Sequence, residues 1–240
     1  MSGLTYRHEP GPEALHKATA QALGEAIDSV LKENGRMVLG LCGGRSARGV
    51  LTHLRGLGIP WERVHIFMVD ERILPIESPE RNFAIVKEVL AAPLIRASEL
   101  PADNVHPFIP RAQFEDFGVK EYTRELDKQG GRYDVVFLSA GEDGHIASLF
   151  PKGSVLSDDP GHILVLDAPK PPPRRMSASR RLLLQSRWGV LIVAGEEKRK
   201  AYEALRDPRT GFAECPAVLV KQLPGAVVLT DLVLEPDKAA

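Results

Sequence analysis

Short, continuous apolar runs alternate along the chain with longer segments in which apolar residues recur at helical spacing. The runs of strand length are Met37–Cys42, Val64–Val69, Tyr133–Ala140, Ile163–Leu166, Gly189–Ala194 and Ala226–Thr230. Continuous apolar strands, rather than strands that alternate apolar and polar residues, are typical of a mostly parallel sheet covered on both faces. The pattern therefore predicts strands that are buried on both sides.

Amphipathic segments between these runs predict helices. They are Pro12–Asn34, a segment that Ser46 would cap, Asn82–Ala91, Gln113–Lys128, Glu196–Leu205 and Val218–Gln222. Because strands and helices alternate and no polar linker divides the chain, we expect one α/β domain over residues 1–240, with helices on both faces of the sheet.

Composition restricts the class of protein. Lys and Arg number 31 against 32 for Asp and Glu, so the formal charge of −1 argues against a nucleic-acid partner. No apolar run approaches the ~20 residues of a membrane-spanning helix, and the N-terminal region does not resemble a secretory signal. With only Cys42 and Cys215, we expect a cytoplasmic protein without disulfide bonds or a thiolate zinc site.

Polar loops follow the strands where a parallel α/β sheet binds its ligands. Gly43-Gly44-Arg45-Ser46 leads from a strand into a helix, where backbone N–H groups and the helix dipole could bind phosphate. It matches neither the dinucleotide fingerprint nor the phosphate-loop motif, and such a turn can also serve packing alone.

Two further charged segments allow a functional or a plain structural interpretation. Asp70-Glu71-Arg72 follows the second apolar run and is either a ligand contact or a solvated end of a strand. Pro169–Arg187 combines three consecutive prolines with several arginines. It is either a stiff loop followed by a solvated basic helix or a source of one arginine for an anionic ligand.

His145 is the histidine that we favour for catalysis. It lies in the loop Gly141-Glu142-Asp143-Gly144-His145, directly after the most apolar run, and Asp143 could fix its tautomer. A loop histidine with a purely structural hydrogen bond is the alternative. The other histidines lack such neighbours in sequence, and no spacing indicates a metal site. The absence of a Gly-x-Ser-x-Gly elbow favours water as the nucleophile, and Cys42 is more readily explained by packing.

Taken together, these segments resemble the 6-phosphogluconolactonase family. The segments that carry the resemblance are Tyr133–Leu138, Gly141–Pro151, Asp70–Arg72 followed by Asn82, Ala168–Pro173 with an arginine after it, and Val193–Lys198. They span nearly the whole chain in the same order. The resemblance implies an open, Rossmann-like α/β fold that is shared with glucosamine-6-phosphate deaminases.

The resemblance also implies a function in the oxidative pentose phosphate pathway. The substrate would be 6-phosphoglucono-1,5-lactone, hydrolysed to 6-phosphogluconate without a metal or an organic cofactor, by a monomer or small homo-oligomer. His145 would be the general base, with Asp143 beside it. The substrate contacts would be Gly43, Gly44, Arg45, Ser46, Asp70, Arg72, Asn82, Gly144, Arg175 and Lys198. Backbone N–H groups near Gly44 or Gly144 could steady the oxyanion.

The chain departs from the family pattern at one position of the glycine turn. The family usually has Gly-Gly-Ser-Thr-Pro where this chain has Gly43-Gly44-Arg45-Ser46-Ala47, so that Arg45 either strengthens phosphate binding or points to solvent. An amino-sugar phosphate deaminase-isomerase on the same fold, a non-catalytic sugar-phosphate sensor and a basic nucleic-acid module are the alternative functions.

Overall fold

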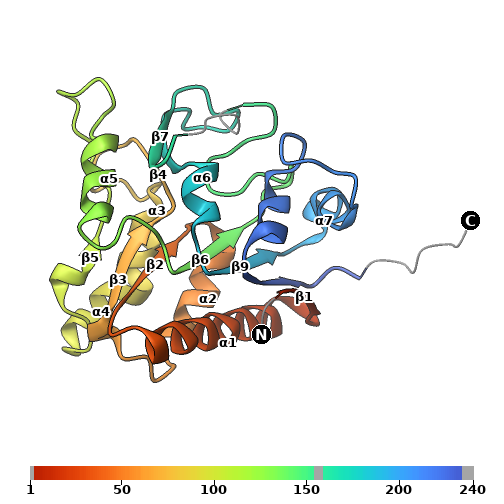
Figure 1. Ribbon diagram of the computed structural model, residues 1–240, viewed down its shortest axis with the longest axis horizontal. Coiled ribbons are helices and arrows are strands. Elements are labelled where there is room, and N and C mark those ends of the chain that lie inside the picture. Colours follow the sequence, from red (N-terminus) through yellow and green to blue (C-terminus); the bar gives the residue numbers. More distant parts are fainter. Residues whose placement is uncertain (1–2, 154–158, 234–240) are drawn as a thin grey trace, which may run out of the picture.

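The computed structural model describes residues 3–153 and 159–233 and contains a parallel sheet with a smaller sheet beside it (Figure 1). The large sheet has the order β1-β10-β9-β6-β2-β3-β5, and every neighbouring pair in it is parallel. Its strands are β1 (Gly3–His8), β2 (Met37–Leu41), β3 (Val64–Met68), β5 (Val105–His106), β6 (Val135–Ser139), β9 (Trp188–Val193) and β10 (Gly225–Thr230). The predicted α/β class with a mostly parallel sheet is confirmed.

The central strands are buried because they carry apolar side chains on both faces. Leu39, Leu41, Phe137 and Val190 are all fully buried. Such strands need cover on each side, which the helices supply. In Figure 1, α1 (Gly11–Glu33) and α2 (Arg45–Arg55) lie below the sheet, and α5 (Val119–Asp127) and α6 (Arg180–Leu184) lie above it.

The smaller sheet is antiparallel and has the order β4-β8-β7. Its strands are β4 (Asp70–Arg72), β8 (Arg175–Ala178) and β7 (His162–Val165). The apolar run Ile163–Leu166 was predicted as a strand of the main sheet, but most of it lies in β7 of this sheet. Pairing between β4 and β8 sets Arg72 opposite Arg175, so the charged triplet and the segment after the prolines come together.

The helices agree with the sequence pattern except where a local backbone feature intervenes. Gln113–Lys128 was expected to be helical throughout, but α5 begins only at Val119, because Gly118 adopts a left-handed φ of 88°. Asn82–Ala91 divides into α3 (Asn82–Val86) and a π-helical turn, η2 (Lys87–Ala91), before α4 (Ala92–Arg96). The remaining helices are η1 (Trp61–Arg63), η3 (Ala102–Asn104), η5 (Glu196–Lys198), α7 (Arg199–Arg206) and η6 (Pro216–Gln222), the last a 3₁₀ helix.

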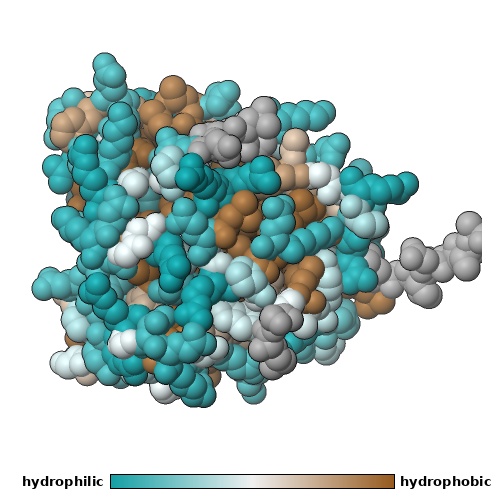
Figure 2. Space-filling model, viewed as in Figure 1, coloured by the Kyte–Doolittle hydropathy of each residue, from teal (hydrophilic) through white to brown (hydrophobic). Residues whose placement is uncertain are grey.

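The surface is mainly polar on the face shown in Figure 2, and hydrophobic residues form small, separated areas there. Within residues 3–153 and 159–233, no helix combines the length and the apolar composition that crossing a bilayer requires.

Candidate active site

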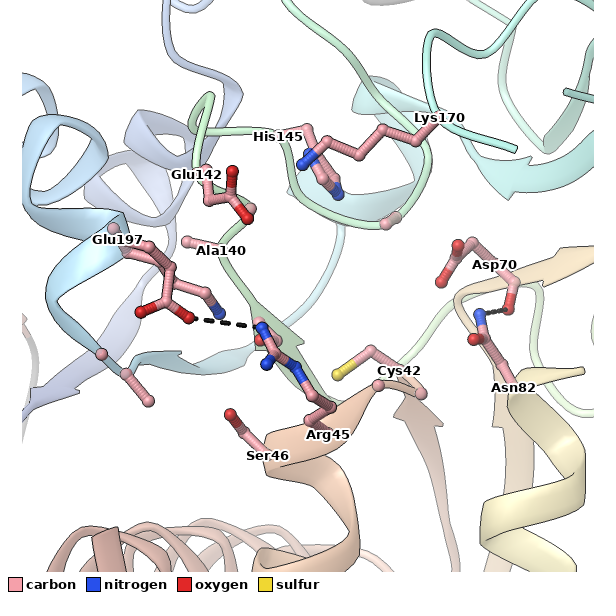
Figure 3. A pocket seen from close by; sticks show the side chains of 18 of the residues that line it. Cys42, Arg45, Ser46, Asp70, Asn82, Ala140, Glu142, His145, Lys170 and Glu197 are labelled. Atoms are coloured by element: carbon pink, nitrogen blue, oxygen red, sulfur yellow. Dashed lines mark hydrogen bonds and ion pairs between the residues drawn. The ribbon is translucent and has the colours of Figure 1, made fainter. Parts of the chain in front are cut away.

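A cavity of about 380 Å³ opens at the carboxyl ends of the central strands (Figure 3). This volume lies within the usual range for small-molecule sites. After β2, the strands β3 and β5 are added on one side of the sheet, and β6 and β9 are then added on the other side. Open α/β folds bind ligands at such a change in strand order, here between β2 and β6. The predicted site residues that line the cavity are Gly43, Gly44, Arg45, Ser46, Asp70, Arg72, Asn82, His145, Arg175 and Lys198.

His145 reaches the cavity on a short loop that follows β6. The Gly141 N–H donates to the carbonyl of His145 at 2.8 Å, and the Gly144 N–H donates to the carbonyl of Gly141 at 3.0 Å. The imidazole packs against Phe150, with ring centroids 4.6 Å apart. The absence of a side chain at Gly141 leaves room for the ring in this position, since a Cβ there would lie 2.1 Å from His145 Nδ1. The loop therefore holds the ring in one orientation.

Asp143 is the direct partner of His145. Its Oδ1 lies 2.5 Å from His145 Nδ1, which fixes the tautomer that carries its proton on Nδ1. Burial raises the pKa of Asp143, but the hydrogen bonds and charge of His145 outweigh this effect and lower the pKa to about 2. Asp143 is therefore ionised at neutral pH. With Nδ1 occupied, Nε2 is the nitrogen of His145 that can accept a proton from a bound water.

The N-terminus of α2 forms another part of the wall. Gly44 has φ 96° at the cap position, and no side chain caps the helix. The prediction that Ser46 caps this helix is therefore wrong, because α2 already begins at Arg45. Gly43 must be glycine, since a Cβ there would lie 2.3 Å from Asn82 Oδ1. The uncapped helix start leaves backbone N–H groups that suit an anion.

Arg175 is a buried cation that a network of oxygen atoms fixes in place. Its guanidinium donates to the carbonyls of Pro172 at 3.0 Å and Lys170 at 2.9 Å. Burial lowers the pKa of Arg175, Asp70 opposes this shift, and the neighbouring Arg72 adds to it. Two arginines opposite one another on paired strands repel unless an anion compensates them. Asp70 and Glu71 partly offset this positive charge, and both arginines line the cavity.

Asp70 and Asn82 hold this wall together by hydrogen bonds. Ser148 Oγ donates to Asp70 Oδ2 at 2.7 Å, and Asn82 Nδ2 donates to the carbonyl of Asp70 at 3.0 Å. The buried Glu71 accepts from the N–H groups of Asn82 and Arg72, at 2.7 Å each. Arg72 donates to the carbonyl of Glu80, and its Nε is buried without a partner among the described residues.

Lysines supply further positive charge at the cavity. Burial lowers the pKa of Lys198, and the carboxylate of Glu197 opposes that shift. Lys170 was not predicted as a site residue, although it lies in the proline run that the family resemblance uses. It lines the cavity and extends toward His145 in Figure 3. Its charge also helps to lower the pKa of Asp143.

Two predicted site residues do not line the cavity. Asp143 is not among the lining residues and contacts His145 at Nδ1. Gly144 has its N–H bonded to Gly141 and its carbonyl bonded to the N–H of Ala217 at 2.9 Å, so it offers no free donor for an oxyanion. Cys42 does reach the cavity wall, but burial raises the pKa of its thiol, which is therefore not a thiolate nucleophile.

The sequence pattern did not identify several other lining residues. They are Pro12, His16, Ser139, Ala140, Gly141, Glu142, Ala147, Ala194, Gly195, Glu197 and Asp231. His16 was set aside because its neighbours in sequence are not comparable to the glycine and aspartate beside His145. It reaches the site because α1 packs beside α2. No three His, Cys, Asp or Glu side chains are grouped for metal binding within the part of the chain that the structure describes.

Comparison with known proteins gives a consistent result. A family model described as glucosamine-6-phosphate isomerases/6-phosphogluconolactonase matches residues 10–229. The chain is 31% identical over 195 residues to a 6-phosphogluconolactonase of Borreliella burgdorferi, which covers 81% of this chain and 83% of the relative. It is also 31% identical over 210 residues to a 6-phosphogluconolactonase of Mycobacterium tuberculosis, with the same coverage of 81% and 83%.

Solved structures share the fold. A 6-phosphogluconolactonase from Thermotoga maritima superimposes with a TM-score of 0.80 at 24% identity, over 95% of this chain and 99% of that one. A monomeric glucosamine-6-phosphate deaminase superimposes with a TM-score of 0.74 at 19% identity, over 95% and 96% of the two chains. At these identities the structural likeness shows the fold alone.

Proposed function

Because the chain belongs to the glucosamine-6-phosphate isomerase/6-phosphogluconolactonase family, we propose that it hydrolyses 6-phosphoglucono-1,5-lactone to 6-phosphogluconate. The observation that carries the proposal is the position of the His145–Asp143 pair. It faces the same cavity as the cations Arg175 and Lys198. The same cavity thus holds a group that can accept a proton and, near it, cations that can bind a phosphate.

The proposed reaction needs only water and His145. Nε2 accepts a proton as the water oxygen bonds to the lactone carbonyl carbon, and Asp143 stabilises the imidazolium that forms. The carbonyl then re-forms and the bond from this carbon to the ring oxygen breaks. The imidazolium returns its proton to the departing ring oxygen, which becomes a hydroxyl group. The products are the open-chain acid and the free imidazole.

The phosphate would supply the binding energy that positions the lactone. Lys198, the uncapped start of α2 and the Arg72–Arg175 pair are the donors available to it. Interactions remote from the reacting bond can hold a substrate in a reactive geometry. We therefore expect changes to these groups to act mainly on KM, and changes to His145 to act on kcat.

A deaminase-isomerase on this fold would need an acid or base at the exit of β3. Asp70 lies there, but it is buried and accepts the hydrogen bond of Ser148 Oγ at 2.7 Å. Asp70 also lines the cavity, so its contacts do not separate the two reactions; the 31% identity to relatives named 6-phosphogluconolactonase is what favours lactone hydrolysis.

The test is the hydrolysis of freshly prepared 6-phosphogluconolactone, coupled to 6-phosphogluconate dehydrogenase and corrected for spontaneous hydrolysis. Removing a general base costs about 10²- to 10⁴-fold, so His145→Ala should lose that factor in kcat with little change in KM. His8→Ala, an exposed histidine outside the cavity, is the matched control. If the wild-type chain does not accelerate hydrolysis but releases ammonia from glucosamine 6-phosphate, the deaminase function replaces this one.

A further inference from the structure

Arg45 occupies a position that is electrostatically unfavourable by itself. It is the first residue of α2, where the helix dipole places partial positive charge, and the first turn of α2 contains no acidic residue. Its side chain is 90% exposed, so packing does not explain it. A cation at this end of a helix is stabilised only when a negative group lies nearby.

Glu197 supplies that negative group from a segment far away in the sequence. Its Oε1 accepts from Arg45 Nη2 at 3.3 Å, and Figure 3 shows the two side chains meeting across the cavity. The carboxylate is folded back over Gly195, where a Cβ would lie 2.4 Å from Glu197 Oε2. It is also the strongest negative influence on the neighbouring Lys198. The carboxylate of Glu197 thus interacts with two cations of the cavity wall, Arg45 and Lys198.

We propose that Glu197 is a resident anion which the phosphate of the substrate displaces from Arg45, so that the Arg45–Glu197 pair selects ligands carrying a doubly charged phosphate. The inference rests on the proposed function, because it assigns the phosphate of that substrate to this end of the cavity. Arg45 is then a binding residue that is held ready by Glu197, and it does not simply point to solvent.

The exchange follows from the strengths of the two interactions. An exposed ion pair is weak because water screens it, so a better ligand can break it at little cost. A phosphate dianion brings two charges and three acceptor oxygens, and a guanidinium binds such a group through two hydrogen bonds. A neutral sugar offers Arg45 nothing comparable and leaves it paired with Glu197. The pair therefore discriminates by charge.

The experiment measures the binding of inorganic phosphate by calorimetry, which does not depend on turnover. Glu197→Gln should lower the Kd by about 3- to 5-fold, the factor expected from losing a weak exposed pair. Arg45→Ala should raise the Kd at least as much. In the Arg45→Ala background, Glu197→Gln should change the Kd by less than about 2-fold, because its effect is exerted through Arg45.

Matched controls lie beside each member of the pair. Glu196→Gln removes a neighbouring carboxylate that is bound to Arg199 at 2.9 Å, and Arg48→Ala removes a cation of α2 that is bound to Glu88 at 2.7 Å. Neither residue lines this cavity, and neither variant should shift the Kd by more than about 2-fold. Circular dichroism of every variant verifies that it folds.

The proposal is overturned if phosphate does not bind the wild type, or if Glu197→Gln leaves the Kd unchanged or raises it. It is also overturned if the effect of Glu197→Gln persists in full without Arg45, because the carboxylate would then act only through its long-range field. A chain that shows the expected pattern of Kd values but does not hydrolyse the lactone would refute the proposed function and leave the exchange intact.

Discussion

Gly141→Ala tests whether the geometry of the loop after β6 sets the rate. The φ of Gly141 lies outside the left-handed region, so an alanine backbone is not strained there. The added Cβ, however, would lie 2.1 Å from both Cε1 and Nδ1 of His145 and 2.8 Å from Asp143 Oδ1. The substitution is therefore directed at the position of the imidazole and leaves its chemistry unchanged.

The size of the effect follows from these distances. Non-bonded carbon atoms are best separated by about 3.5–4.0 Å, so the ring must move by more than about 1 Å. Misplacing a catalytic group by about 1 Å can cost about 10²-fold in rate. We expect kcat for 6-phosphogluconolactone to fall by about that factor. KM should change little, because Lys198 and the start of α2 are untouched.

The assay is the coupled hydrolysis assay, run with Gly153→Ala as the matched control. Gly153 also lies in a loop that follows the histidine, but a Cβ there meets nothing closer than 3.6 Å. In a His145→Ala background, Gly141→Ala should cause almost no further loss, since the ring it displaces is gone. A Gly141→Ala enzyme whose kcat stays within about threefold of the wild type would refute the assignment of His145 as a base held by this loop.

Three further predictions concern single side chains. Asp143→Asn should lower kcat by about 10²- to 10⁴-fold while keeping the protein folded, since the ion that stabilises the imidazolium is lost; unchanged kcat in the hydrolysis assay would contradict this. Lys198→Ala should raise KM for the phosphorylated lactone, and an equal rise for gluconolactone would exclude a phosphate contact. His162 is buried against the hydroxyl of Tyr133 at 2.7 Å, and burial lowers its pKa to about 3. Because the unfolded state takes up the proton first, stability should fall by up to about 1.4 kcal/mol per pH unit as the pH drops from about 6.5 to 3. Urea unfolding at a series of pH values should show that the unfolding free energy of His162→Gln depends less steeply on pH than that of the wild type. An unchanged pH dependence would mean that other groups cause the acid destabilisation.

The main sheet could be predicted because its central strands are unusually simple in sequence. A run such as Val135–Leu138 is apolar on both faces, and glycine or charged residues follow the runs at Cys42, Val69 and Ala140. The strands β4 and β8 were not predicted, since the charged and small residues of which they largely consist are individually poor strand formers. Asp70–Arg72 is a triplet of charged residues that becomes β4 only because β8 pairs with it. Pairing between segments distant in sequence is not visible in a local pattern.

The residues of the candidate site likewise fall into those that the sequence could predict and those that it could not. The residues that follow the strands were identified because parallel strands bring their carboxyl ends together, and His145 belongs to this group. His16 and Asp231 were missed because they arrive through helix packing and through the last strand of the sheet. Glu197 was missed for another reason. A glutamate in a charged segment is ordinary, and only its contact with Arg45 gives it significance.

The arrangement of the cavity explains why one fold can separate binding from chemistry. The proton-accepting group comes from the loop after β6 and is positioned by Gly141, Asp143 and Phe150, all within that loop or directly beyond it. The cations come from other elements, α2, η5 and β8, although Arg175 of β8 lies over the same Phe150 ring that packs against His145. Arg45 is bound to Glu197 of η5 and is highly exposed, so a substitution there can change which anion binds without moving the imidazole. This independence allows Arg45 to replace a small hydroxyl residue while the catalytic loop keeps the family pattern.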